Sequence, residues 1–104
     1  MGVDLENVSE IEKRLIFTEA DLILLALYDG EKMISKLREI TGLSTTAIYR
    51  NVDKLLSAGL VEERRSGSPA NRFIKLTPRG ARLAALLRQL EEELKPRMRV
   101  FTPE

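Results

Sequence analysis

The stretch GLSTTAIYRNVDKLLSAGL, Gly42–Leu60, predicts one helix with two unlike faces. Ile48, Val52 and Leu55 recur at spacings of four and three, as on a helix face that is buried in a core. The other side carries hydroxyls, a phenol and a guanidinium in place of the Glu and Lys that usually cover an exposed helix face. We therefore expect a helix over about 44–58 whose outer face has a role beyond solubility.

A second, shorter helix is expected immediately before this one. Ile34, Leu37 and Ile40 recur at intervals of three, and Gly42 suits the left-handed position that follows the end of a helix. Ser44 then suits the N-cap of the next helix, because its hydroxyl can accept a hydrogen bond from a free amide. Two short helices that meet at a Gly-Leu-Ser turn are typical of a helix-turn-helix.

The residues that follow predict a β-hairpin. LVEERR (60–65) and RFIKL (72–76) are strand candidates, and SGSPAN between them has turn chemistry throughout. Thr77-Pro78 then caps and opens a helix over about 78–95, since Pro suits the first position of a helix. A minimal strand over 31–33 precedes the helix-turn-helix.

The N-terminal part predicts helices that complete the core. Thr18, with Asp21 three residues on, can form a capping box, and DLILLALY supplies a buried face up to Asp29-Gly30. Val8, Ile11 and Leu15 stand at helical spacing and predict a short helix near 8–16.

The predicted fold is mainly α with a small β-hairpin: a winged helix-turn-helix with a C-terminal dimerisation helix. The chain has 104 residues, of which 43% are hydrophobic, enough for a single core. We therefore expect one domain over 1–104, with the winged-helix core at about 17–77 and the dimerisation helix at 78–95.

Composition excludes several classes of function. The chain has no Cys and no His, which excludes disulfides and thiolate zinc sites and removes the commonest general base. Its acids occur in charge runs rather than as an isolated pair in an apolar setting, so we expect no catalytic residues, no metal, no cofactor and no enzymatic activity. The apolar run LILLALY is too short to span a bilayer, which needs roughly 20 residues. With no signal-peptide pattern, a cytoplasmic protein without membrane contact is expected.

Charge is distributed unevenly along the chain. The overall net charge is +1, but residues 1–30 carry a net charge of −5 and residues 43–82 a net charge of +5. This separation favours a polyanionic partner for the central part. The same pattern is compatible with two solvated faces.

The outer face of the 44–58 helix fits double-stranded DNA. The first turn of the second helix in a helix-turn-helix enters the major groove, and short hydroxyls let the backbone approach. Arg50 can donate paired hydrogen bonds to guanine, worth about 1–3 kcal/mol of discrimination, and Tyr49 can donate to a phosphate. Taken singly, these residues also suit a first helical turn, the edge of a core or a solvated charge. The candidate DNA-binding residues of this helix are Ser44, Thr45, Thr46, Tyr49, Arg50 and Lys54.

Three arginines flank the hairpin tip: Arg64, Arg65 and Arg72. Such a wing can lie along the DNA backbone or enter a narrow A·T minor groove, whose negative potential attracts guanidinium groups. A hairpin charged only for solubility is the alternative. Glu62 and Glu63 would repel phosphate, so alternation along the strand must direct at least one of them elsewhere.

The 78–95 helix carries a leucine stripe that predicts a dimer. Its members, at spacings of four, three and four, are Leu83, Leu87, Leu90 and Leu94. The alternative is a helix buried against its own domain, because two heptads are too few to establish a coiled coil. A twofold dimer would place two reading helices one DNA turn apart.

Over roughly residues 17–90 the sequence resembles MarR-like winged-helix transcription regulators. The segments that carry the resemblance are FTEADLILLALYDG, LREITGLSTTAIYRNVDKLLSAGLVEERR and IKLTPRGARLAALL. It implies a homodimer that binds operator DNA, usually to repress. Base contacts carry over to Thr45, Thr46, Tyr49 and Arg50, and wing contacts carry over to Arg64, Arg65 and Arg72.

The chain also departs from this family. It has less helix before Thr18 and a single helix after the wing, where members place their dimer interface and effector pocket, so the resemblance leaves a small-molecule effector uncertain. Arg38 stands where members often have a small residue packed on the next helix, which predicts a looser or shifted contact there.

Two classes of function fit this sequence. The first is a sequence-specific regulator that binds double-stranded DNA, a homodimeric repressor in the form that the resemblance implies. The alternative is a winged-helix module for protein–protein contact in a transcription or replication assembly. That module would have an apolar or acidic exposed face in place of hydroxyls and arginines.

Overall fold

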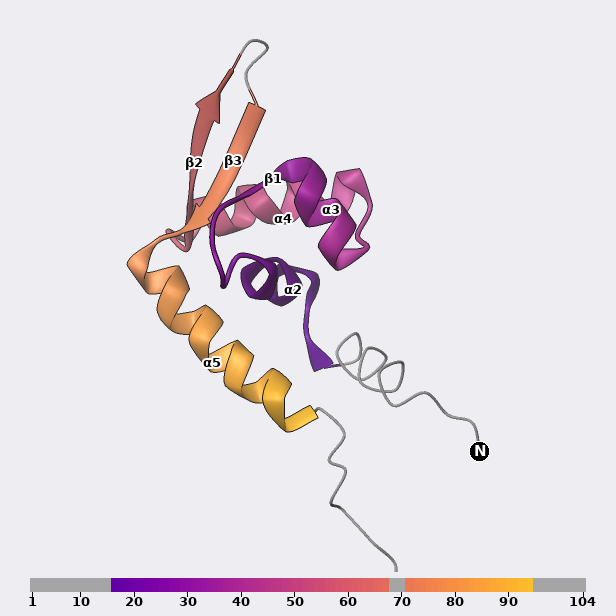
Figure 1. Ribbon diagram of the computed structural model, residues 1–104, viewed down its shortest axis with the longest axis vertical. Helices are drawn as coiled ribbons and strands as arrows, with labels where there is room; N and C mark the ends of the chain where they lie inside the picture. The colour runs from indigo at the N-terminus through magenta and orange to yellow at the C-terminus, as the bar shows by residue number, and fades with distance from the viewer. Residues whose placement is uncertain (1–15, 68–70, 95–104) are drawn as a thin grey trace, which may run out of the picture.

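The structure is a computed structural model that describes residues 16–67 and 71–94. Within these residues it confirms the predicted winged helix-turn-helix, mainly α with a small antiparallel sheet (Figure 1). The helix predicted near 8–16 lies outside the described residues, except for its last residue. The elements are α2 (Glu19–Ala26), β1 (Lys32–Met33), α3 (Ile34–Thr41), α4 (Thr45–Ser57), β2 (Val61–Ser66), β3 (Asn71–Leu76) and α5 (Pro78–Leu94).

The start of α2 is fixed by the predicted capping box. The Thr18 hydroxyl accepts a hydrogen bond from the Asp21 amide, and the Thr18 amide donates to the Asp21 carboxylate, both at 3.1 Å. The helix buries Ile23 and Leu24 in the core. It ends at Ala26, a few residues before the expected end, and turns lead from there to β1.

The buried face of α3 differs from the spacing of three that predicted the helix. Ile34, Leu37 and Thr41 are buried, whereas Ile40 is 48% exposed. At 3.6 residues per turn, spacings of three and then four stay on one face, while repeated spacings of three drift away from it. Thr41 tolerates burial because its hydroxyl donates to the Leu37 carbonyl at 2.7 Å and accepts from the Leu43 amide at 3.2 Å.

The caps predicted for α4 are present at both ends. Gly42 precedes the helix with φ of 74°, and the Ser44 hydroxyl accepts from the Ala47 amide at 3.1 Å. Gly59 follows the helix with φ of 73°. Between the caps, Ile48 and Val52 are fully buried, as their spacing predicted.

The sheet has the strand order β1-β3-β2, with both pairings antiparallel. Strands β2 and β3 pair from Val61↔Leu76 to Ser66↔Asn71, so both strands reach one residue further toward the tip than predicted. The hairpin projects beyond the helices as the wing (Figure 1).

The LTPRG segment, 76–80, joins the end of α4 to the start of α5. The Thr77 hydroxyl donates to the Gly59 carbonyl at 2.7 Å and accepts from the Gly80 amide at 3.1 Å. Arg79 Nη1 donates to the Ala58 carbonyl at 3.1 Å. The backbones approach so closely that a Cβ atom on Gly80 would lie 1.9 Å from the Leu60 carbonyl oxygen.

Helix α2 lies between α5 and the α3–α4 pair (Figure 1). One cluster of apolar side chains joins these helices to the sheet, with Ile23, Leu27, Leu37, Ile48 and Ile74 among its fully buried members. None of the helices in the described part of the chain is long and apolar enough to cross a membrane. The packing leaves the first turns of α4 and the wing on the outside.

Candidate nucleic-acid interface

The exposed side of α4 carries the predicted hydroxyls and cations. Thr45, Thr46 and Lys54 are exposed, and Tyr49 is 39% exposed. The Ser44 hydroxyl is already used as the N-cap of the helix, so its role in the free protein is structural. This side of the helix can approach a groove closely at its first turn, because the exposed side chains there, Thr45 and Thr46, are short.

An open hollow of about 370 Å³ separates the first half of α4 from the wing. Its polar lining comes from three elements that are far apart in the sequence. The contributing side chains are Ser35 and Arg38 of α3, Thr45 and Tyr49 of α4, and Arg65, Asn71 and Arg72 of the wing. Three guanidinium groups and three hydroxyls therefore surround one surface depression, an arrangement suited to an anionic strand.

Arg38 occupies a different environment from the one that the family resemblance suggested. It is exposed and lines the hollow, whereas α3 reaches the core through the fully buried Leu37. Arg38 therefore adds a cation to the candidate interface. Sequence reasoning missed this role and that of Ser35, although an arginine on the outer face of the first helix of a helix-turn-helix was the available signal.

The wing arginines divide between the two faces of the hairpin. Arg65 pairs directly with Arg72, and Arg64 pairs with Phe73, so the register places Arg64 on the opposite face. The structure therefore brings Arg65 and Arg72 to the hollow, while Arg64 is not part of its lining.

Arg72 is held by a carboxylate and an aromatic ring. Its Nε and Nη2 donate to the two oxygens of Glu63 at 2.7 and 2.9 Å, and its guanidinium lies 5.2 Å from the ring centroid of Tyr49. The hydrogen bond from Arg72 lowers the pKa of the Glu63 carboxyl below its ordinary value and raises the pKa of Arg72. Arg72 thus links the wing to α4, and its side chain is only 19% exposed.

Arg64 is held in the same manner on the other face. Its Nη2 and Nε donate to Glu31 at 2.5 and 3.3 Å, and its guanidinium lies 4.4 Å from the ring centroid of Phe73. The hydrogen bond from Arg64 lowers the pKa of Glu31. Arg64 therefore stabilises the junction between the wing and the segment before β1.

Arg65 is the most exposed of the three wing arginines. Its side chain is 63% exposed, and its Nε donates a hydrogen bond to Glu63 at 3.0 Å. Glu63 is neutralised by two arginines, while Glu62 is on the other face opposite Lys75. Alternation thus directs Glu62 to the other face, as expected for at least one of the two acids, and ion pairing neutralises Glu63.

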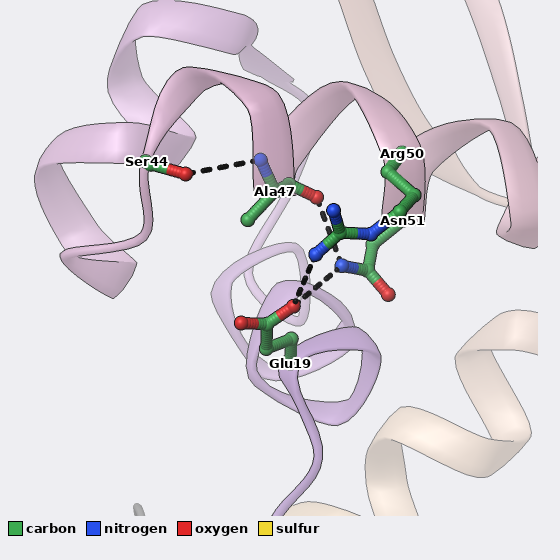
Figure 2. A network of polar contacts seen from close by, with 5 residues as sticks. All are labelled: Glu19, Ser44, Ala47, Arg50 and Asn51. Carbon is green, nitrogen blue, oxygen red and sulfur yellow. Dashed lines mark hydrogen bonds and ion pairs between the residues drawn. The ribbon is translucent and has the colours of Figure 1, made fainter.

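A polar network joins α4 to the first turn of α2 (Figure 2). Arg50 Nη2 lies 3.3 Å from Glu19 Oε1, and Asn51 Nδ2 donates to the same oxygen at 3.0 Å. Asn51 also donates to the Ala47 carbonyl at 2.8 Å, and only 6% of the residue is exposed. Sequence reasoning did not identify Asn51 or Glu19. The available signal was a polar residue among the apolar positions of α4.

The leucine stripe of α5 divides between two environments. Leu87 packs against the chain's own core beside the fully buried Ala84, and Leu94 is partly buried. Leu83 and Leu90 are 38% and 44% exposed, and Leu86, which the sequence places beside this stripe, is 60% exposed. The exposed apolar face of α5 is therefore Leu83, Leu86 and Leu90, at spacings of three and four. We call it the α5 leucine face.

This fold is that of MarR-like winged-helix transcription regulators. The chain belongs to the family described as the N-terminal domain of the methanogenesis regulatory protein FilR1, whose family model matches residues 9–94. No curated protein sequence matches the chain.

Solved structures share the fold at low sequence identity. AF1382 from Archaeoglobus fulgidus aligns with a TM-score of 0.70 and 18% identity, over 83% of this chain and 99% of its own. The MarR family transcriptional regulator SPO1453 from Silicibacter pomeroyi aligns with a TM-score of 0.65 and 21% identity, over 86% of this chain and 64% of its own. The adhesin competence repressor AdcR from Streptococcus pyogenes aligns with a TM-score of 0.69 and 15% identity, over 81% of this chain and 63% of its own. The chain thus spans less than two thirds of the length of the last two proteins.

Proposed function

We propose that this chain is a transcription regulator that binds double-stranded DNA sequence-specifically. The observation that carries the proposal is the hollow between α4 and the wing, where Arg38, Arg65 and Arg72 converge beside one serine, one threonine and one tyrosine hydroxyl. A concave cationic surface next to a helix with a short-chained outer face is complementary to a phosphate backbone beside a major groove.

In this proposal α4 enters the major groove. Thr45, Thr46 and Arg50 face base edges and nearby phosphates, and Lys54 contacts the backbone further along the helix. The wing lies on the backbone or in the minor groove, with Arg65 as its cationic contact. Arg72 and Tyr49 keep the wing at a fixed position against α4, since they are in contact.

We further propose that the protein acts as a homodimer, with the α5 leucine face as the contact between copies. The proposed single domain has its winged-helix core at 17–77 and its dimerisation helix at 78–95. A dimer that occupies a two-fold operator excludes other proteins from it, so we propose repression as the regulatory outcome. We also propose that the protein acts in the cytoplasm. The proposal includes no catalytic step and no cofactor.

The alternative, a module for protein–protein contact, has less support at α4. It expects an apolar or acidic outer face, whereas the exposed residues in the first half of α4 are threonines, Tyr49 and Arg50.

The proposal is tested by titrating the protein with a mixed-sequence duplex of about 30 base pairs at several salt concentrations. We expect a steep fall of affinity with salt, because each neutralised phosphate releases counterions. Arg38→Gln should reduce the salt slope by about 1, as expected for one phosphate contact. Arg88→Gln on α5 is the control and should leave the slope unchanged. Absence of binding at low salt would refute the proposed function.

A further inference from the structure

Glu19 lies outside the helix-turn-helix and still contacts its second helix (Figure 2). Its Oε1 accepts from Asn51 Nδ2 and lies 3.3 Å from Arg50 Nη2. We propose that Glu19 determines specificity: its carboxylate positions Arg50 for contact with bases and disfavours contact of Arg50 with phosphates. This inference deepens the proposed function and rests on it.

The position of the Glu19 carboxylate is fixed by the fold. Glu19 is the first residue of α2, directly after the Thr18 N-cap, and α2 is anchored in the core by Ile23. Asn51 holds the carboxylate from the other side, and its buried amide needs an acceptor for each of its two hydrogens. Ala47 supplies one acceptor and Glu19 supplies the other. The carboxylate therefore stays beside Arg50 for reasons that are independent of Arg50.

Arg50 keeps most of its hydrogen-bonding capacity despite this contact. Its side chain is 54% exposed, and the contact with Glu19 involves only Nη2. The remaining N–H groups suffice for the two parallel hydrogen bonds that guanine O6 and N7 accept. Because Glu19 already restricts the Arg50 guanidinium through Nη2, Arg50 loses less rotamer freedom when it binds a base.

The same carboxylate affects phosphates and bases differently. A phosphate that approaches Arg50 also approaches Glu19, and two like charges repel within the Debye length of about 8 Å at physiological salt. The edge of guanine is a neutral acceptor, so this repulsion is much smaller there. Glu19 therefore weakens the binding of Arg50 to arbitrary DNA more than its binding to a matching base pair.

The test is Glu19→Gln, which keeps an oxygen acceptor for Asn51 and removes the charge. A preferred sequence is first selected from a randomised duplex pool with the wild-type protein. For the variant we expect affinity for random duplex to rise about twofold and preference for the selected sequence to fall about twofold to fivefold, the range of an exposed ion pair. Glu92→Gln is the matched control, because Glu92 also pairs with an arginine, Arg88, and has a side-chain exposure of 50% against 47% for Glu19. The control should leave the preference unchanged.

A double-mutant cycle shows whether Glu19 acts through Arg50. In an Arg50→Ala background, Glu19→Gln should cause no further loss of preference, and urea unfolding of each variant verifies the fold. The inference would be overturned by an unchanged sequence preference in Glu19→Gln. It would also be overturned by an equal loss of preference with and without Arg50. Either result would leave the proposed function standing. If the wild-type protein does not bind duplex DNA at low salt, the proposed function and this inference both fail.

Discussion

At the scale of single residues, the structure gives each part of the LTPRG segment a separate task. Thr77 caps α5 and holds the Gly59 carbonyl, and Arg79 donates to the Ala58 carbonyl at the end of α4. Gly80 allows α5 to approach the chain at Leu60, where a side chain has no space. The segment is therefore a joint between the helix-turn-helix and α5, with a steric requirement at one residue.

We predict that Gly80→Ala destabilises the protein strongly. Its Cβ would lie 1.9 Å from the Leu60 carbonyl oxygen, a backbone atom that cannot move without shifting the strand, so the loss should reach the upper end of about 1–3 kcal/mol. Gly59→Ala is the comparison: φ there is 73° but nothing lies within 4 Å of the added Cβ, so we expect a loss of about 1 kcal/mol. Urea unfolding measures both. A smaller loss for Gly80→Ala than for Gly59→Ala would contradict the steric argument.

At the scale of elements, local chemistry was readable from the sequence and long-range pairing was not. The caps Thr18 and Ser44 were predicted because a cap depends on residues within one turn. The contacts of Glu19 with Asn51 and of Glu31 with Arg64 join residues more than 30 positions apart, and no local pattern encodes them. The division of the wing arginines follows from strand register, which the flanking turn residues alone do not determine.

Arg64 and Arg65 should behave differently although they are neighbours in β2. Arg65→Ala should weaken binding to all DNA sequences and reduce the salt slope by about 1, because it removes an exposed cation beside the hollow. Arg64→Ala should leave the slope unchanged and lower stability, since Glu31 and Phe73 lose a partner. Salt-dependent binding and urea unfolding separate the two effects. Equal losses of DNA affinity would contradict the assignment of the two faces.

The Glu63–Arg72 pair should make stability depend on pH in the acid range. The pKa of Glu63 is lower in the folded protein than its ordinary value of 4.5, so the unfolded chain binds the proton more readily. The contribution of Glu63 is complete above pH 4.5 and is lost as pH falls through the folded-state pKa. Glu63→Gln should therefore lower stability near neutral pH and flatten this part of the profile of unfolding free energy against pH. An unchanged profile would show that the pair does not contribute.

At the scale of the whole molecule, the two charge regions predicted from the sequence partly meet in space. Glu19, from the acidic N-terminal region, lies against Arg50 of the basic region. Net charge along the chain therefore overstates the positive potential on this edge of α4. Of the arginines at the hollow, Arg65 and Arg72 belong to the basic region and Arg38 of α3 lies outside it, so the tertiary fold adds a cation that the basic region does not contain.

The exposed apolar surface of α5 allows a direct test of the proposed dimer contact. The predicted stripe included Leu87, which packs against the chain's own core, so a charged substitution there would destabilise the fold as well as the proposed dimer. Leu86 and Leu90 are exposed, and Leu86→Glu with Leu90→Glu would place charges on the proposed contact without removing core packing. We expect the wild-type protein to be a dimer and the double variant to be a monomer by size-exclusion chromatography with light scattering.

The matched control for this prediction is Ile40→Glu. Ile40 is 48% exposed on α3, close to the 44% of Leu90, so the same charge is added at an equally accessible apolar residue away from α5. If the dimer depends on the α5 leucine face, Ile40→Glu stays dimeric while the double variant dissociates. A dimer that survives both changes would place the contact elsewhere. Loss of the dimer in both variants would show that added charge, rather than this face, controls association. The double variant should also bind operator DNA more weakly than the wild type, because two recognition helices on one dimer share a single binding event.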